Sequence, residues 1–185
     1  MRIAVYPGSF DPLHIGHLAI MEYLSSLREF DSVYLIVSPR NPLKDPLKAR
    51  NAEQRYLDAL KAVGKYPHLR VKVDDIEFTL GEPNYTIRTL DALKQREKGN
   101  DFTLVIGADN LDSIHLWKDS ERILLDYGVA VYPRKGFDLQ ALKADLLEEN
   151  PLYRISIIDA PEFDVSSTLI RRLMEEGKDA SALLM

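Results

Sequence analysis

Six short apolar runs alternate with segments of helical periodicity, and this alternation limits what the chain can fold into. The runs at 33–37 and 102–106 show no polar alternation, which is typical of parallel strands covered on both faces. The order predicts an α/β fold, a doubly wound parallel sheet with helices on both faces. The predicted strands are 3–5, 33–37, 69–73, 102–106, 128–132 and 155–158, and the predicted helices are 18–27, 52–63, 86–96, 119–125, 139–147 and 168–176.

Length and composition narrow the class of protein. The chain has 185 residues, 45% of them hydrophobic, which predicts a single domain over residues 1–185 with an ordinary core. It contains no cysteine, so thiol catalysis and disulfides are excluded, and the predicted location is cytoplasmic. The apolar start is too short for a signal peptide, and no run is long enough to span a membrane. The net charge of −5 argues against a nucleic-acid partner.

The loops that follow the predicted strands carry the unusual residues. Ligands of doubly wound sheets bind beyond the carboxyl ends of the strands. Five such loops contain glycine, basic or hydroxyl residues. Because all of them lie at one edge of the predicted sheet, we expect a single binding crevice there. The five loops are 8–17, 38–44, 107–110, 133–136 and 165–171.

The first of these loops, GSFDPLHIGH, is typical of a phosphate-binding loop. Gly8 allows a tight turn and a close ligand, and the amides of a following helix N-terminus attract anions. If that helix begins near Ile15, His14 and His17 share one face of its first turn and can hold a polyphosphate. Gly16 leaves room for a flat base or a ribose. Surface histidines or a zinc pair are the alternatives, but the zinc signature is absent, so no metal ligand is predicted.

The last loop carries hydroxyl groups ahead of a helix. One of Ser166, Ser167 and Thr168 is expected to be the N-cap of that helix, because serine and threonine favour this position. Capping by one of them leaves another hydroxyl and the free amides of the first turn able to hold a phosphate. Arg171 follows one turn later and can add positive charge to the same site.

Two middle loops add a guanidinium and a carboxylate. Arg134 follows the fifth strand, a position that suits binding a polyphosphate, and the alternative is a solvent-exposed arginine. Gly107 follows the fourth strand and permits close approach of a ribose or base, while Asp109 can accept hydrogen bonds from sugar hydroxyls. The alternative for Asp109 is an Asx turn.

A third group of residues is placed to meet a second substrate. Trp117, the only tryptophan, lies near the rim after the fourth strand and suits stacking on a pyridine ring. The alternative for a single tryptophan is a place in the core. Tyr85 and Thr86 begin a predicted helix, where Thr86 also suits capping. Lys44 lies in a proline-rich loop and can reach an anionic substrate.

Together these segments resemble a known family. The motifs GSFDPLHIGH, SPRNPLK, NYTIRTL, VIGADNLDSIHLWKD, YPRKG and VSSTLIR, within residues 3–173, are similar to those of bacterial nicotinate-nucleotide adenylyltransferases. That family lies in the HxGH nucleotidyltransferase superfamily. The resemblance implies a Rossmann-like nucleotidyltransferase fold. It also implies adenylyl transfer from ATP to nicotinate mononucleotide in NAD biosynthesis, with both as small-molecule partners.

The resemblance also implies roles for individual residues. It makes four residues catalytic: His14, His17, Arg134 and Arg171. It makes ATP ligands of Gly8, Ser9, Phe10, His14, His17, Gly107, Asp109, Arg134, Ser166, Ser167 and Arg171. It makes nicotinate mononucleotide ligands of Lys44, Tyr85, Thr86 and Trp117. The expected cofactor is Mg²⁺, bound through the ATP phosphates and water rather than by a protein cage.

Two residues depart from the family pattern. Ser9 replaces the usual threonine and keeps the hydroxyl, and Lys135 replaces the proline that commonly follows the arginine, which affects how Arg134 is presented. The opening GSFDP also fits pantetheine-phosphate adenylyltransferase, and a nucleotide sensor without turnover is a further alternative. The sequence leaves open nicotinate against nicotinamide mononucleotide as acceptor, loop closure on the substrate, and a homo-oligomer against a monomer.

Overall fold

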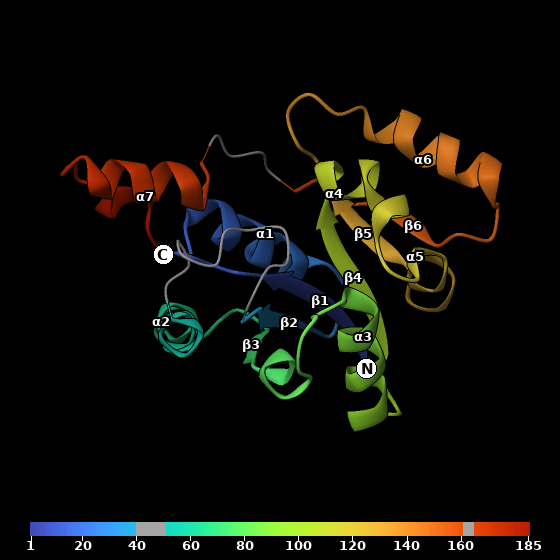
Figure 1. Cartoon of the computed structure of the whole chain (residues 1–185), viewed down its shortest axis with the longest axis horizontal. Coiled ribbons are helices and arrows are strands. Elements are labelled where there is room, and N and C mark those ends of the chain that lie inside the picture. Colours follow the sequence, from blue (N-terminus) through green and yellow to red (C-terminus); the bar gives the residue numbers. More distant parts are fainter. Residues whose placement is uncertain (40–50, 161–164) are drawn as a thin grey trace.

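The computed structural model of the chain describes residues 1–39, 51–160 and 165–185. Its centre is a six-stranded parallel sheet with the strand order β3-β2-β1-β4-β5-β6 (Figure 1). This is the order of sheets built from two nucleotide-binding halves, and it confirms the predicted doubly wound architecture. The strands are β1 (Arg2–Gly8), β2 (Ser32–Val37), β3 (Val71–Asp74), β4 (Asp101–Gly107), β5 (Val129–Tyr132) and β6 (Ile155–Ile157).

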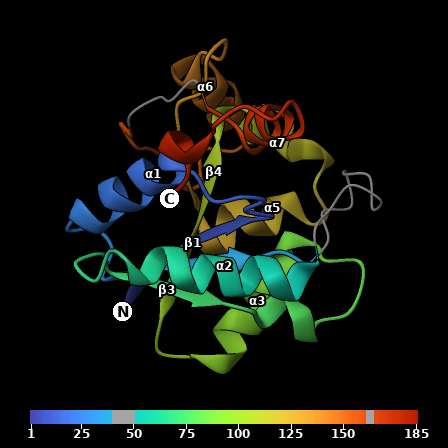
Figure 2. The same cartoon turned by 90° about the vertical axis from the view of Figure 1, so that its left-hand side faces the viewer.

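Both faces of the sheet are apolar, because successive side chains of a strand point to opposite faces. In β1, Ile3 and Val5 belong to one core and Ala4 and Tyr6 to the other, and none of the four is more than 3% exposed. This two-sided burial explains the continuous apolar runs. Helices cover each face (Figures 1 and 2): α1 (Ile15–Ser26) and α2 (Ala52–Gly64) on one, and α3 (Thr86–Arg96), α4 (Ala108–Asp112), the π-helical η4 (Ile123–Tyr127) and α6 (Leu139–Glu149) on the other.

Several predicted boundaries are wrong: α1 begins at Ile15 rather than at residue 18, and β1 continues to Gly8 rather than ending at residue 5. Residues 107–110, predicted as a loop, lead directly into α4 with Gly107 as the N-cap, because a helical turn there buries Ala108 and Leu111. The third strand begins at Val71 rather than at residue 69. Leu69 instead closes a turn, in which its N–H donates to the carbonyl of Tyr66 at 3.0 Å.

The helix predicted over 119–125 is divided in the structure. The short α5 (Ser120–Arg122) is followed at once by η4, so the segment changes from α-helical to π-helical hydrogen bonding. Gly128 ends η4, and its N–H donates to the carbonyl of Ile123 at 2.8 Å. Gly128 has a φ of +76°, and a Cβ there would lie 2.8 Å from the Cβ of Arg154. Glycine is therefore required between η4 and β5.

The last part of the chain returns to the start of α1. Ile170 of α7 (Ser167–Glu175) packs in a small core with Ile15 of α1. Leu184, just beyond the 3₁₀ turn η5 (Ser181–Leu183), forms an isolated antiparallel bridge with His14. The C-terminal segment therefore packs against the loop of residues 8–17, which carries His14 and His17. Two further 3₁₀ turns are η2 (Ile76–Thr79) and η3 (Ile114–Leu116).

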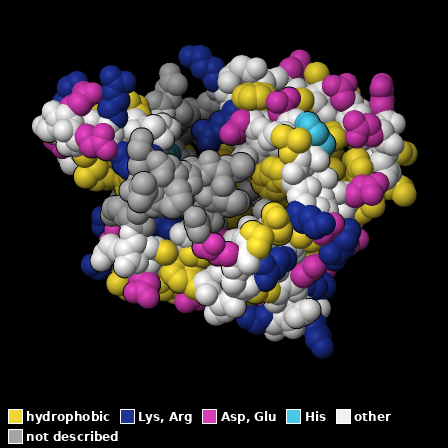
Figure 3. Space-filling model, in the orientation of Figure 1, with side chains coloured by type: hydrophobic (Ala, Val, Ile, Leu, Met, Phe, Trp, Pro, Cys, Tyr) yellow, Lys and Arg dark blue, Asp and Glu magenta, His cyan; other side chains and the backbone are white. Residues whose placement is uncertain are grey.

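Figure 3 shows basic and acidic side chains interspersed on the visible face of the molecule. This mixture agrees with the modest net charge of −5. The described surface on this side is therefore not dominated by one sign of charge.

Within 1–39, 51–160 and 165–185, every helix falls short of the length and apolarity that crossing a membrane requires.

Candidate active site

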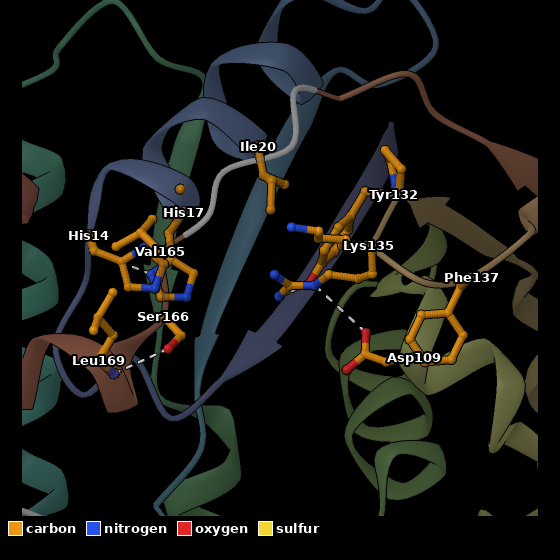
Figure 4. Close-up of a pocket in the computed structure, with 13 residues that line it drawn as sticks. His14, His17, Ile20, Asp109, Tyr132, Lys135, Phe137, Val165, Ser166 and Leu169 are labelled. Atoms are coloured by element: carbon orange, nitrogen blue, oxygen red, sulfur yellow. Dashed lines mark hydrogen bonds and ion pairs between the residues drawn. The ribbon is translucent and has the colours of Figure 1, made fainter. Parts of the chain in front are cut away.

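A cavity of about 860 Å³ lies at the carboxyl edge of the sheet, where the segments after β1, β4, β5 and β6 meet (Figure 4). Ligand pockets generally measure roughly 300–1,000 Å³, so the cavity can hold a nucleotide. Four of the five predicted loops therefore contribute to one crevice. The lining residues are His14, Gly16, His17, Ile20, Asp109, Tyr132, Pro133, Arg134, Lys135, Phe137, Val165, Ser166 and Leu169.

The two histidines form a stacked pair at the start of α1. Their ring centroids are 3.7 Å apart with an interplanar angle of 25°. Helix α1 begins at Ile15, which is earlier than the predicted residue 18 but meets the condition for His14 and His17 to share its first turn, and His14 is the N-cap. The backbone N–H of His14 donates to Nδ1 of His17 at 3.2 Å. Since Nδ1 accepts, the neutral His17 ring carries its proton on Nε2, which makes Nε2 a donor for an anionic ligand.

His14 is a buried and uncharged imidazole. The ring is 5% exposed, and burial, together with the nearby charge of Arg134, lowers its pKa to about 4. Its Nδ1 has no hydrogen-bond partner among the described residues. A buried polar atom without a partner is costly, and this one belongs to a residue that lines the cavity. An anionic ligand would favour the protonated imidazole and could accept a hydrogen bond from its Nδ1–H.

The low pKa of His14 predicts a loss of stability in acid. The pKa is about 4 in the folded state and 6.5 in an ordinary histidine, so the unfolded chain binds more protons between these values. The contribution of His14 to stability is therefore complete above pH 6.5 and falls as the pH approaches 4. When the pH is lowered from 7 to 4.5, we expect the free energy of unfolding of the wild type to fall by about 2 kcal/mol more than that of His14→Gln. Urea denaturation at the two pH values measures this difference.

The exposed His68 supplies the control for this measurement. A His68→Gln variant is expected to follow the wild-type curve, because His68 is exposed and does not line the cavity. Equal acid losses in the wild type and in His14→Gln would contradict the account of His14.

Phe10 and Tyr6 support the ring of His17. Phe10 meets it edge-on with centroids 5.1 Å apart, and Tyr6 lies 6.3 Å away. Phe10 has a φ of +44°, and its ring covers Gly8, where a Cβ would lie 2.8 Å from a ring atom. In this structure Gly8 therefore makes room for an aromatic side chain that positions a histidine.

Arg134 lines the same cavity as the two histidines, and its charge is near enough to lower the pKa of His14. Its Nε lies 3.7 Å from Oδ1 of Asp109, and its Nη2 donates to the hydroxyl of Tyr132 at 3.4 Å. These groups crowd Gly107, where a Cβ would lie 3.2 Å from the Arg134 Nε. The Arg134 side chain is 41% exposed, and ion pairs open to solvent are weak. The guanidinium can therefore exchange Asp109 for a phosphate at little cost.

Helix α7 is hydrogen-bonded to the loop that carries His14 and His17, on the side away from the cavity. Ser166 lines the cavity and is the N-cap, which confirms that one of the three hydroxyl residues has this role. The hydroxyl of Ser167 donates to the carbonyl of Pro12 at 3.0 Å. Nη1 of Arg171 donates to the carbonyl of Asp11 at 2.6 Å. Ser167 and Arg171 therefore hold the loop from behind, and neither lines the cavity.

Comparison with known proteins places this geometry in a family. The sequence matches the cytidylyltransferase-like family model over residues 5–173. A Flavobacterium johnsoniae protein named probable nicotinate-nucleotide adenylyltransferase is 36% identical, over 100% of this chain and 92% of that protein. A protein of the same name from Bacteroides fragilis is 39% identical, over 96% of this chain and 84% of that protein. The chain belongs to the nicotinate-nucleotide adenylyltransferase family. This is a family of nucleotidyltransferases, as the motifs predicted.

Solved structures share the fold of this nucleotidyltransferase. Nicotinic acid mononucleotide adenylyltransferase of Plasmodium falciparum, complexed with APC, matches it with a TM-score of 0.80 and 18% identity, over 99% of this chain and 90% of that one. The same parasite protein complexed with NaAD also gives 0.80, at 19% identity, over 96% and 86% of the two chains. These matches confirm the Rossmann-like nucleotidyltransferase fold.

Three of the four residues predicted for nicotinate mononucleotide, which are Tyr85, Thr86 and Trp117, do not line the cavity. Trp117 is half-buried and packs against the core on the α3 side of the sheet. Tyr85 is the N-cap of α3 and is 41% exposed, and Thr86 is the first residue of that helix. Lys44 lies outside the described residues. In this nucleotidyltransferase, any role for the three described residues lies in a subsite outside the cavity.

Sequence reasoning missed Tyr132 as a functional residue. It is 7% exposed, lines the cavity, and lies under Arg134, whose guanidinium is 5.1 Å from the centre of the Tyr132 ring. The signal that could have found it is spacing: side chains two residues apart in a strand share a face. An aromatic residue two positions before a binding arginine is therefore placed to support it. Lys135 and Phe137 also line the cavity.

Proposed function

We propose that this nucleotidyltransferase transfers the adenylyl group of ATP to nicotinate mononucleotide. The products are nicotinate adenine dinucleotide and pyrophosphate. The observation that carries the proposal is the stacked pair of His14 and His17, which lines one cavity together with Arg134 in a chain of this family. The names of the relatives support nicotinate mononucleotide as the acceptor.

The reaction needs no protein nucleophile. A phosphate oxygen of nicotinate mononucleotide forms a bond to the α-phosphorus of ATP. At the same time the bond breaks between that phosphorus and the oxygen that bridges the α- and β-phosphates. Pyrophosphate leaves with the electron pair. Nε2–H of His17 and the guanidinium of Arg134 stabilise the charge that develops on the phosphates. Alignment of the two substrates supplies much of the remaining acceleration.

Mg²⁺ is part of the proposal as a companion of ATP. Within the described residues there is no group of three histidine, aspartate or glutamate side chains that could hold a metal, and the cavity lining contains one carboxylate, Asp109. These residues fit an ion that keeps its water and phosphate ligands. When bound, Mg²⁺ would neutralise part of the charge on the pyrophosphate group.

A comparison of acceptors tests the proposed activity. The protein is mixed with ATP and Mg²⁺ and with nicotinate mononucleotide, nicotinamide mononucleotide or phosphopantetheine in turn, and pyrophosphate and the adenylylated product are measured. The proposal expects the highest kcat/KM with nicotinate mononucleotide. Turnover with phosphopantetheine alone would support the pantetheine-phosphate enzyme, and ATP binding without any product would support a nucleotide sensor.

We propose that Trp117 stacks on the pyridine ring of the acceptor. Trp117→Ala is then expected to weaken nicotinate mononucleotide binding by roughly three- to tenfold, the usual value of an aromatic stacking contact. ATP affinity should stay nearly unchanged, and both constants are measurable by calorimetry. The neighbouring Leu116 is 76% exposed, so Leu116→Ala is the control and should leave both affinities as they are. A larger loss for ATP than for the mononucleotide would refute the stacking role.

A further inference from the structure

Arg55 is the one lysine or arginine among the described residues that is buried, with an exposure of 1%. Nη1 donates to the carbonyl of Ser9 at 2.5 Å and to that of Ser38 at 2.9 Å, and Nη2 donates to the carbonyl of Pro39 at 2.8 Å. A guanidinium presents its donors in a rigid plane. Arg55 of α2 therefore fixes the start of the loop after β1 relative to the start of the loop after β2.

A chain of contacts leads from Arg55 to His17. The peptide unit between Ser9 and Phe10 is planar, so holding the Ser9 carbonyl also sets the direction of the Phe10 N–H. Phe10 has a left-handed backbone conformation, with a φ of +44°. Its ring then meets the His17 ring edge-on at 5.1 Å. Movement of the Ser9 carbonyl is therefore transmitted to the imidazole that faces the cavity.

The loop after β2 is held from a second side as well. The side chain of Ser38 is hydrogen-bonded to the carboxyl group of Glu77, which lies in η2 and is 5% exposed. The hydroxyl of Thr89 in α3 donates to Oε1 of Glu77 at 2.8 Å. Buried polar networks that are fully paired fix a unique arrangement. Arg55 is the member of this network that reaches the histidine loop.

We propose that Arg55 is a positioning residue for adenylyl transfer, which sets the Ser9–Phe10 backbone and, through Phe10, the place of the His17 imidazole. This inference rests on the proposed function for its kinetic test. The three residues whose carbonyls accept from Arg55, which are Ser9, Ser38 and Pro39, do not line the cavity. The effect of Arg55 on the reaction therefore passes through the loop that it holds.

The test compares Arg55→Lys with the wild type. Lysine keeps the positive charge but cannot hold three carbonyls in one plane. We expect kcat to fall roughly 10- to 100-fold, because small misplacements of a catalytic group cost this much. KM for ATP and for nicotinate mononucleotide should change by less than about threefold. In Arg55→Ala, added ethylguanidinium should restore part of the lost kcat.

Arg70 provides the matched control. It also donates to three backbone carbonyls, those of Ser25, Leu27 and Phe30, but these precede β2, at the opposite edge of the sheet from the cavity. Arg70→Lys is expected to lower the melting temperature while kcat stays within about twofold of the wild type. A kcat for folded Arg55→Lys within threefold of the wild type would overturn the proposal.

Two further measurements test the inference, and the first of them does not depend on the folding of the Arg55 variants. Phe10→Leu removes the ring contact and should lower kcat about as much as Arg55→Lys, so an unchanged kcat would overturn the proposal. The ¹⁵N resonances of His17 should shift in Arg55→Lys and stay in place in Arg70→Lys. This second readout needs no turnover. It therefore separates failure of the inference from failure of the proposed function, which an inactive wild type would reveal.

Discussion

Replacing His17 with alanine is expected to lower kcat about 100- to 1,000-fold, the usual loss when one donor to a developing negative charge is removed. The KM for ATP should rise far less, because the interaction strengthens only as charge develops in the transition state. The structural reason is the hydrogen bond from the His14 N–H to Nδ1 of His17, which makes Nε2–H the donor of the neutral ring. Steady-state kinetics with both substrates varied measures the two effects.

A glutamine at position 17 makes the test sharper. Its amide N–H can lie close to the position of Nε2–H but cannot carry a positive charge. His17→Gln should therefore retain more activity than His17→Ala if a neutral donor is what the reaction needs. His115→Ala is the control, since that histidine is exposed and does not line the cavity. A turnover number for His17→Ala within threefold of the wild type would remove His17 from the mechanism.

The second large effect is expected at Arg134. Arg134→Met should lower kcat/KM for ATP about 100-fold, because a guanidinium that binds phosphate contributes strong charge-assisted hydrogen bonds. Arg134→Lys should lose less, since it keeps the charge but not the planar fork. The same Met variant should raise the pKa of His14, because the charge of Arg134 is one cause of its low value. Kinetics and an NMR titration of His14 measure the two consequences.

Arg122 offers a matched control for this substitution. It is a surface arginine, paired with Asp91 through both terminal nitrogens at 3.1 and 3.0 Å, and it does not line the cavity. Arg122→Met should leave kcat/KM unchanged. If Arg134→Met and Arg122→Met behave alike, then Arg134 has no part in binding the triphosphate.

The architecture was predictable because strands that are buried on both faces of the sheet appear in the sequence as continuous apolar runs. Strand residues such as Ile3 and Ala4 are apolar although they lie on opposite faces of the sheet. An unbroken apolar run therefore indicates a central parallel strand. A predicted boundary is wrong where tertiary packing, rather than local sequence, determines where an element begins. Ala108 and Leu111 are drawn into a helical turn by burial, and local propensity near Gly107 does not reveal this.

The site was predictable only in part. Position along the chain indicated that the segments with His14, His17, Asp109, Arg134 and Ser166 share one edge, and all five line the cavity. Sequence position does not tell which way a side chain turns. Ser167 and Arg171 lie one turn apart in α7, yet both reach backwards to loop carbonyls. The sequence did not indicate a role for Arg55. Its partners are main-chain carbonyl oxygens, which every residue has, so no particular residue type marks them in the sequence.

The most direct measurement is a crystal structure of the protein with a non-hydrolysable ATP analogue and Mg²⁺. The account predicts that the triphosphate lies in the cavity, with phosphate oxygens within hydrogen-bonding distance of Nε2 of His17 and of the Arg134 guanidinium. The ion pair between Arg134 and Asp109, at 3.7 Å in this structure, should be broken. A triphosphate bound elsewhere, with that ion pair and the stacked histidines untouched, would contradict it.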